Sequence, residues 1–378
     1  MTTQYLTIAS KRRQMSGYLA SLADFSVTPG AAVNPEIVRD SPNISLYCHD
    51  DATRRAIFVE LPPEVDLAQA PFIYQTQYDQ AQRLIAVPYD TFQRLAHELP
   101  AIDRLIVVYM TGRSGSTLVS HLFNQLDGVL SLSEPDVTTQ FVHLRRPDGR
   151  RDAELRALLD HTMRFLFKPT AARTASTAVL KMRSEGVQVM DLFQATFPQA
   201  RNLFLYRDAI GWVTSFSRIF QRAGWLDPLP MGEFVTLFSQ IFQYDFSRLA
   251  GYLEAGTTAA TATQRLTLWW LAIMEWYLSQ AARGIPILPV RYADLNTCRE
   301  QVVTHIFTYC GFPTAAVQET LGVFARDSQA GTPAARDNPH AGNPLQLTEE
   351  QRRDVVRILQ RHAVVQESDF VVPGTLHV

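Results

Sequence analysis

Four continuous apolar runs divide the chain after Pro100, and long segments with helical periodicity separate them. The runs cover residues 104–110, 177–182, 201–207 and 285–292. Strands that are buried on both faces read as continuous apolar runs, and their alternation with helices is typical of a parallel sheet covered on both sides. The sequence therefore predicts an α/β fold, with a parallel β-sheet flanked by helices.

The first hundred residues have a different texture. Short runs rich in β-branched and aromatic residues, separated by Pro, Asp and polar turns, predict strands at "ISLYC", "AIFVEL", "FIYQTQY" and "RLIAVPY". We expect a helix within residues 1–30 and another at "TFQRLAHEL". The chain is accordingly divided near residue 100 into an N-terminal β-containing accessory region, 1–100, and an α/β domain, 101–378.

Composition limits the classes of partner. The net charge of −2 gives no reason to expect nucleic acid or an anionic membrane as a partner. The three cysteines are widely spaced and form no CxxC pair, which argues against a disulfide framework or a zinc site and favours a reducing compartment. No secretory signal is evident, and the most apolar stretch, from Leu266, is interrupted by Glu275 and predicts a buried helix. We expect a cytoplasmic protein without a bound metal.

The segment "RLIVVYMTGRSGSTLVSHLF" predicts a strand, an anion-binding loop and a helix. Backbone N–H groups at a helix N-terminus favour an anion, and glycines permit its close approach. The side-chain donors of the loop are Arg113, Ser114, Ser116 and Thr117, with Gly112 before them and Gly115 among them. Gly115 is followed by Ser116 and not by the Lys of a nucleoside-triphosphate loop. The sequence thus favours a P-loop-type sheet with an unusual anion; an ordinary polar turn capped by Ser or Thr is the alternative.

A second strand-to-helix junction follows in "LFLYRDAIGWVTSFSRIF". Arg207 ends the apolar run, and Ser215 lies eight positions later in the predicted helix. An Arg and a Ser at this interval could hold a phosphate, whereas Arg207 and Asp208 alone would also fit a salt-bridged helix start.

In this order, "RSGST" and "RDAIGWVTS" resemble the sulfotransferases that use 3′-phosphoadenosine-5′-phosphosulfate (PAPS). "FPQARNLFLYRD", "VRYADL" and "GFP" are similar to further segments of that family, so the resemblance covers about 103–336 and leaves residues 1–100 outside it. The resemblance implies that Arg113, Ser114, Gly115, Ser116 and Thr117 bind the 5′-phosphosulfate. It also implies that Arg207 and Ser215 bind the 3′-phosphate, that Tyr292 contacts the donor, and that the bisphosphate PAP is the product.

The resemblance also suggests catalytic residues. Glu134, in "SLSEP", lies where tyrosylprotein sulfotransferases and bacterial members have a general base, and Lys181 lies where the family contacts the bridging oxygen. Cytosolic members have a His base two positions after that Lys, but Arg183 stands here and cannot accept a proton. We therefore expect Glu134 as base, with Lys181 and Arg113 stabilising charge; the alternatives are an exposed turn residue and a surface lysine.

The resulting hypothesis is sulfuryl transfer from PAPS to a hydroxyl of a small metabolite, by in-line displacement. A P-loop small-molecule kinase and a non-catalytic nucleotide-binding relative are the alternatives. Residues 1–100 could form a lid, part of the acceptor pocket or the contact of a homodimer. The resemblance implies that the loop 326–344 closes over the donor, with Ser328 and Arg336 as contacts, although its sequence departs from the R-K-G-x-x-G-D-W form of the cytosolic branch.

Overall fold

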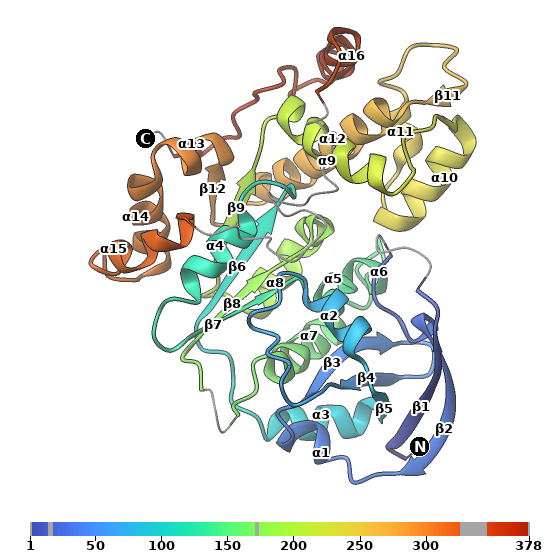
Figure 1. Cartoon of the computed structure of the whole chain (residues 1–378), viewed down its shortest axis with the longest axis vertical. Coiled ribbons are helices and arrows are strands. Elements are labelled where there is room, and N and C mark those ends of the chain that lie inside the picture. The colour runs from blue at the N-terminus through green and yellow to red at the C-terminus, as the bar shows by residue number, and fades with distance from the viewer. Residues whose placement is uncertain (1, 14–17, 171–173, 326–345, 377–378) are drawn as a thin grey trace. The chain divides into compact units, whose positions relative to one another are not determined.

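The computed structural model describes residues 2–13, 18–170, 174–325 and 346–376 (Figure 1). The chain forms two compact units. The first comprises residues 1–107 and 123–200, and the second comprises residues 108–122 and 201–378. The units do not follow the predicted division near residue 100, because residues 123–200 pack with the N-terminal region.

An antiparallel sheet of five strands forms the N-terminal part of the first unit, in the order β2-β1-β5-β4-β3 (Figure 1). Its strands are β1 (Gln4–Lys11), β2 (Phe25–Ala32), β3 (Ile44–Asp50), β4 (Arg55–Glu60) and β5 (Arg83–Pro88). One face buries an apolar cluster that includes Leu6, Phe25, Tyr47, Ile57 and Leu84. This burial fixes the register of the sheet, because a slip of one residue would turn the cluster towards solvent.

Helices and short turns complete the first unit. They are η1 (Leu22–Asp24), α1 (Ile37–Asp40), α2 (Ile73–Gln80), α3 (Tyr89–His97), α5 (Asp136–Thr139), α6 (Phe141–Leu144), α7 (Asp152–Leu166), η2 (Ser184–Val189) and α8 (Met190–Thr196). The helix predicted at "TFQRLAHEL" is confirmed as α3.

Two predictions for the N-terminal region are wrong. The helix expected within residues 1–30 is replaced by β1 and β2, because β1 pairs with both β2 and the distant β5. The strand expected at "FIYQTQY" is the helix α2. Its residues Ile73 and Gln77 are both buried four positions apart, which is the spacing of one helix face, and Gln77 Nε2 donates to the Leu46 carbonyl at 2.9 Å.

A five-stranded sheet in the order β12-β9-β6-β8-β7 confirms the predicted α/β fold. Its strands are β6 (Leu105–Met110), β7 (Val129–Ser133), β8 (Thr177–Lys181), β9 (Arg201–Tyr206) and β12 (Ile287–Arg291). The four apolar runs are β6, β8, β9 and β12, and β7 is the additional strand that brings the chain to Glu134. β7 pairs with β8 in parallel in the first unit, and β9 pairs with β12 in parallel in the second. β6 contributes residues to both units.

The second unit is mainly helical around β9 and β12. Its other elements are α4 (Ser116–Phe123), α9 (Ala209–Arg222), β10 (Leu229–Pro230), α10 (Met231–Phe242), α11 (Phe246–Ala250), β11 (Ala259–Ala260), α12 (Ala262–Ala282), α13 (Tyr292–Thr297), α14 (Arg299–Cys310), α15 (Ala316–Thr320), η3 (Leu321–Ala325) and α16 (Glu349–Gln360). α12 is the predicted buried helix, with Leu266 and Trp270 fully buried. Among the described helices, none has the length and apolar character needed to cross a bilayer.

Lys168 links three parts of the first unit. It follows α7, and its ammonium group donates to the carbonyl oxygens of Val38, Ser41 and Ile44 at 2.6, 2.7 and 2.9 Å. These carbonyls belong to α1, to the turn after it and to the start of β3. One tetrahedral cation therefore satisfies three backbone acceptors at the edge of the N-terminal sheet.

We predict that Lys168→Met lowers the free energy of unfolding by about 2–4 kcal/mol, because it removes the hydrogen bonds to three backbone carbonyls and leaves these partly buried acceptors unpaired. Burial lowers the pKa of Lys168 to about 7, so the effect rests on the hydrogen bonds and not on a full charge. Denaturant unfolding of wild type and variant measures the difference. Lys11→Met is the matched control, since the exposed Lys11 donates to a single carbonyl, that of Asp79. Equal stability of the two variants would contradict the prediction.

Candidate active site

The loop between β6 and α4 has a backbone that few sequences can adopt. Gly112 and Gly115 have φ of 79° and 81°, and Arg113 between them has φ of 52°. A Cβ atom at Gly115 would lie 2.8 Å from Leu295 Cδ2 and 3.3 Å from the ring of Tyr292. The loop therefore requires glycine at this position for both its conformation and the close approach of α13.

Arg113 and Ser215, predicted from separate motifs, are hydrogen-bonded to each other. Arg113 Nε donates to Ser215 Oγ at 2.9 Å. Arg207 Nη1 lies 3.5 Å from the carbonyl oxygen of Arg113, and the Arg207 guanidinium stacks on the ring of Tyr292 at 4.7 Å from its centroid. We call Arg113, Ser114, Arg207, Ser215 and Tyr292 the phosphate cluster. All five residues belong to the second unit.

Two polar atoms of the phosphate cluster are buried without a hydrogen-bond partner, Ser114 Oγ and Arg207 Nε; the carboxylate of Asp208 lies 3.9 Å from Arg207 Nε, at ion-pair distance but beyond that of a hydrogen bond. Buried donors are normally satisfied, so each of these calls for an explanation. Oxygen atoms of a bound anion would supply it, and the charge of two guanidinium groups suits a dianion. The residues present therefore fit the phosphate groups of the donor that the sequence suggests.

The side chains of Ser116 and Thr117, the other two donors predicted in the loop, lie in the first turn of α4 and are not part of the phosphate cluster. Ser116 opens α4, and its hydroxyl donates to Met110 Sδ at 2.6 Å. Thr117 is buried in the first turn of the same helix. Their backbone N–H groups lie at the helix N-terminus, which is the part of the loop that favours an anion.

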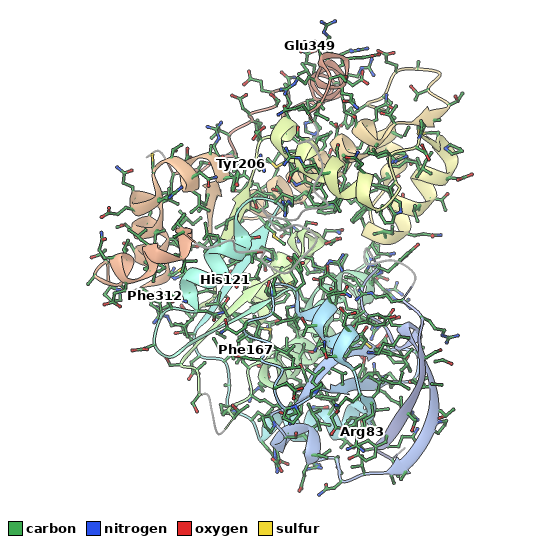
Figure 2. All side chains as sticks on the ribbon, viewed as in Figure 1. Arg83, His121, Phe167, Tyr206, Phe312 and Glu349 are labelled. Carbon is green, nitrogen blue, oxygen red and sulfur yellow. The ribbon has the colours of Figure 1, made fainter. Side chains whose placement is uncertain are left out.

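Two tryptophans donate hydrogen bonds to backbone carbonyls at the phosphate cluster and its loop. Trp212 Nε1 donates to the Thr111 carbonyl at 2.6 Å, and Trp270 Nε1 donates to the Arg207 carbonyl at 3.0 Å. Trp212 is fully buried on α9, and no sequence motif predicts its hydrogen bond to the loop. Tyr206, labelled in Figure 2, ends β9 just before Arg207, and its hydroxyl pairs with Thr375 Oγ1 at 2.8 Å.

Glu134 and Lys181 form a buried ion pair in the first unit. Glu134 Oε1 lies 2.6 Å from Lys181 Nζ, and the exposed fractions of the two side chains are 8% and 1%. Ser133 and Lys181 are opposite each other in the register of β7 and β8. The Glu134 N–H continues this ladder by donating to the Lys181 carbonyl at 2.8 Å. The two functional groups meet because parallel strands end at the same edge of a sheet.

Phe72 of the N-terminal region lies next to this ion pair. The Lys181 ammonium lies 5.4 Å from the centroid of the Phe72 ring and donates to Ser133 Oγ at 3.1 Å. Arg183 has its Nη1 3.1 Å from Asp136 Oδ1. Burial opposes the charge of Arg183, but Asp136 and Glu185 outweigh it and raise the pKa of Arg183 above its ordinary value.

Backbone strain marks two of the predicted site residues. Among the described residues, four that are not glycine have positive φ: Arg54, Arg113, Glu134 and Gln243. Such conformations are unfavourable for residues with a side chain and persist where surrounding contacts impose them. Two of the four are the predicted charge stabiliser and the predicted base.

The remaining expectations concern the loop 326–344 and a metal. Ser328 and Arg336 lie outside the residues that the structure describes. Within the described ranges, no three His, Cys, Asp or Glu side chains form a group that could hold a metal ion.

The chain is similar to solved structures of sulfotransferases. A sulfotransferase from Mycobacterium avium matches with 14% identity and a TM-score of 0.38, over 72% of this chain and 80% of that one. The sulfotransferase domain of the curacin biosynthetic pathway matches with 15% identity and a TM-score of 0.37, over 68% and 96%. A sulfotransferase from Alicyclobacillus acidocaldarius matches with 13% identity and a TM-score of 0.39, over 69% and 95%. No protein-family model and no curated protein matches the sequence.

We predict that Gly115→Ala distorts the loop, lowers stability by about 1 kcal/mol or more and weakens binding of inorganic sulfate, since alanine is strained at this φ and meets Leu295. Thermal unfolding with and without sulfate measures both effects. Gly232→Ala in α10 is the control, because a Cβ atom there has nothing within 4 Å. Sulfate stabilisation of Gly115→Ala equal to that of the control would refute the prediction.

Proposed function

We propose that the protein transfers a sulfuryl group from PAPS to a hydroxyl of a small-molecule acceptor. The observation that carries the proposal is the hydrogen bond between Arg113 and Ser215. These residues come from the two motifs assigned to the two phosphate ends of one donor, and Arg207 of the second motif lies against the carbonyl of the first. The missing loop lysine disfavours a nucleoside triphosphate as donor.

The phosphate cluster is proposed to bind the donor without a metal. Arg207 and Ser215 would hold the 3′-phosphate, with Tyr292 stacked on the Arg207 guanidinium to keep its donors in place. Arg113, Ser114 and the backbone N–H groups of Gly115, Ser116 and Thr117 would hold the 5′-phosphosulfate. The preformed loop limits the entropy lost when the donor binds.

Glu134 and Lys181 are proposed to act on the reacting atoms. Glu134 removes the proton of the acceptor hydroxyl as that oxygen forms a bond to sulfur. The bond between sulfur and the bridging oxygen breaks, and the electron pair leaves with the 5′-phosphate of PAP. Lys181 stabilises this charge by donating to the bridging oxygen, and Arg113 stabilises the equatorial sulfuryl oxygens. Before substrates bind, the 2.6 Å ion pair keeps both buried charges compensated.

We further propose that the N-terminal region forms part of the acceptor pocket. Phe72 supports this role over that of a lid or a dimer contact, because its ring lies beside the Lys181 ammonium. A ring at this position would suit a small acceptor with an apolar body next to its hydroxyl. A cytoplasmic location belongs to the proposal and is supported by the small number and wide spacing of the three cysteines in the sequence. A homodimer and the lack of a nucleic-acid partner stay predictions.

Calorimetric titration with adenosine 3′,5′-bisphosphate tests the donor assignment. Wild type should bind with micromolar affinity, and Arg207→Ala should weaken binding by about 10- to 100-fold, because it removes a charge-assisted contact to a phosphate. ATP with magnesium is the comparison ligand. Tighter binding of ATP with magnesium, or no binding of the bisphosphate, would overturn the proposal and favour the kinase alternative.

Glu134→Gln should lower turnover of PAPS with a panel of simple phenols and alcohols by about 10²- to 10⁴-fold and leave the bisphosphate affinity unchanged, because glutamine cannot accept the proton. Formation of PAP and of the sulfated acceptor measures turnover. Glu154→Gln is the matched control: Glu154 also pairs with cations in the first unit, Arg54 and Arg151. Wild-type turnover in Glu134→Gln would place the base elsewhere.

A further inference from the structure

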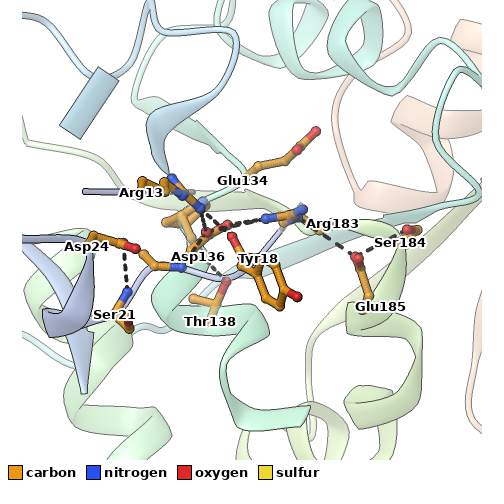
Figure 3. Close-up of polar contacts among 12 residues, drawn as sticks. Arg13, Tyr18, Ser21, Asp24, Glu134, Asp136, Thr138, Arg183, Ser184 and Glu185 are labelled. Carbon is orange, nitrogen blue, oxygen red and sulfur yellow. Dashed lines mark hydrogen bonds and ion pairs between the residues drawn. The ribbon is translucent and has the colours of Figure 1, made fainter. Parts of the chain in front are cut away.

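Asp136 is the centre of a buried ionic network next to Glu134 (Figure 3). It has no exposed surface, and its Oδ2 accepts from Arg13 Nη2 at 2.9 Å and from the Ala20 N–H at 2.8 Å. Its Oδ1 accepts from Arg183 Nη1 at 3.1 Å. One carboxylate therefore binds two guanidinium groups and one backbone amide, and two of these three donors come from the first 20 residues.

Both cations of the network are held by the same aromatic ring. The guanidinium carbons of Arg13 and Arg183 lie 5.1 and 4.9 Å from the centroid of Tyr74, and the two side chains are 4% and 11% exposed. Burial is the main cause that raises the pKa of Tyr74 above its ordinary value, so the phenol stays neutral between them. The desolvation of buried charges commonly offsets their attraction, so stability alone is a poor reason for such a network.

The network is attached to Glu134 through a rigid link. Pro135 alone separates Glu134 from Asp136, and its ring fixes one backbone dihedral of the connection. Glu134 itself has φ of 54°, a conformation that a glutamate adopts only under constraint. On the other side, Ser133 Oγ donates to the Pro71 carbonyl at 2.6 Å. The N-terminal region thus holds the chain immediately before and shortly after the strained residue.

We propose that the Arg13–Asp136–Arg183 network positions the carboxylate of Glu134 for proton transfer, with Arg13 as the positioning residue supplied by the N-terminal region. The inference rests on the proposed function, because it assigns Glu134 a proton to remove. Arg183 accordingly helps to hold the base in place through its ion pair with Asp136. In the cytosolic sulfotransferases that the sequence resembles, the base itself stands at the position of Arg183. Arg13 and the Ala20 N–H thus contribute to the proposed chemistry through their hydrogen bonds to Asp136.

The test compares turnover with donor binding. Arg13→Met should lower kcat for PAPS by about 10- to 100-fold, since a small displacement of a catalytic group has effects of this size, while KM for PAPS and the bisphosphate Kd stay near wild type. Arg13→Lys should recover most of kcat because it returns a cation to Asp136. Arg145→Met is the matched control: Arg145 also joins two carboxylates of the first unit, Asp152 and Asp191.

A kcat for Arg13→Met equal to that of Arg145→Met would overturn the inference, and so would an equal loss of bisphosphate affinity in Arg13→Met. If Arg13→Met does not fold, Tyr74→Leu replaces it. This variant removes the shared ring and leaves every ion pair of Asp136 intact, and the same fall in kcat with unchanged KM for PAPS is expected.

Hydrogen exchange separates failure of this inference from failure of the proposed function. The Glu134 amide, which donates to the Lys181 carbonyl, should exchange about tenfold faster in Arg13→Met than in wild type, because local opening of the segment becomes easier. Exchange in the 111–117 loop should not change. This measurement needs no substrate, so it decides the positioning role even if wild type binds no bisphosphate. Unchanged exchange at Glu134 would overturn the inference.

Discussion

The ion pair between Glu134 and Lys181 is the interaction on which the proposed chemistry of the first unit depends. Neither charge could be buried alone, since an isolated carboxylate or ammonium in a protein interior loses its hydration without compensation. The pair can form because β7 and β8 are parallel neighbours whose ends coincide, with Ser133 opposite Lys181. The same geometry makes the pair useful: a proton acceptor and a cation lie at one sheet edge, each held by backbone hydrogen bonds.

The sequence was sufficient where a local pattern decides the structure. Continuous apolar runs located β6, β8, β9 and β12. Residues that come shortly after a strand, such as Arg113 and Arg207, could then be placed at the edge of the sheet. The prediction from sequence failed where the conformation of a segment depends on partners that are far away in the sequence. Residues 4–11 are a strand because β2 and β5 flank them, and α2 is a helix although its aromatic and β-branched residues favour a strand.

The network around Asp136 shows a second limit of local reasoning. Arg13 and Asp136 are far apart in sequence, and no spacing rule connects them. The positive φ of Glu134 is equally invisible, because glutamate has no preference for that region. Sequence motifs therefore predict which groups are chemically suited to a role, whereas the contacts of the Glu134 segment come partly from N-terminal residues outside the motifs. These residues, Arg13, Ala20, Pro71, Phe72 and Tyr74, lie outside the strands of the antiparallel sheet, in its connecting segments and in α2.

The positions of the lysines can also be explained by the geometry of the groups that they contact. Of the 35 basic residues of the chain only Lys11, Lys168 and Lys181 are lysines, so arginine is the default cation here. Lys168 serves three carbonyl oxygens, and Lys181 serves a carboxylate and a hydroxyl beside the Phe72 ring. Both sites use a compact cation whose donors point in tetrahedral directions, which the planar fork of arginine cannot reproduce. At the end of β8 an arginine would present a planar, fixed set of donors to Glu134, whereas an ammonium is a point charge with rotatable donors. In the proposed reaction such a cation can exchange the carboxylate for a single oxygen atom that gains charge, which is a chemical reason for lysine at position 181 in a chain that otherwise prefers arginine.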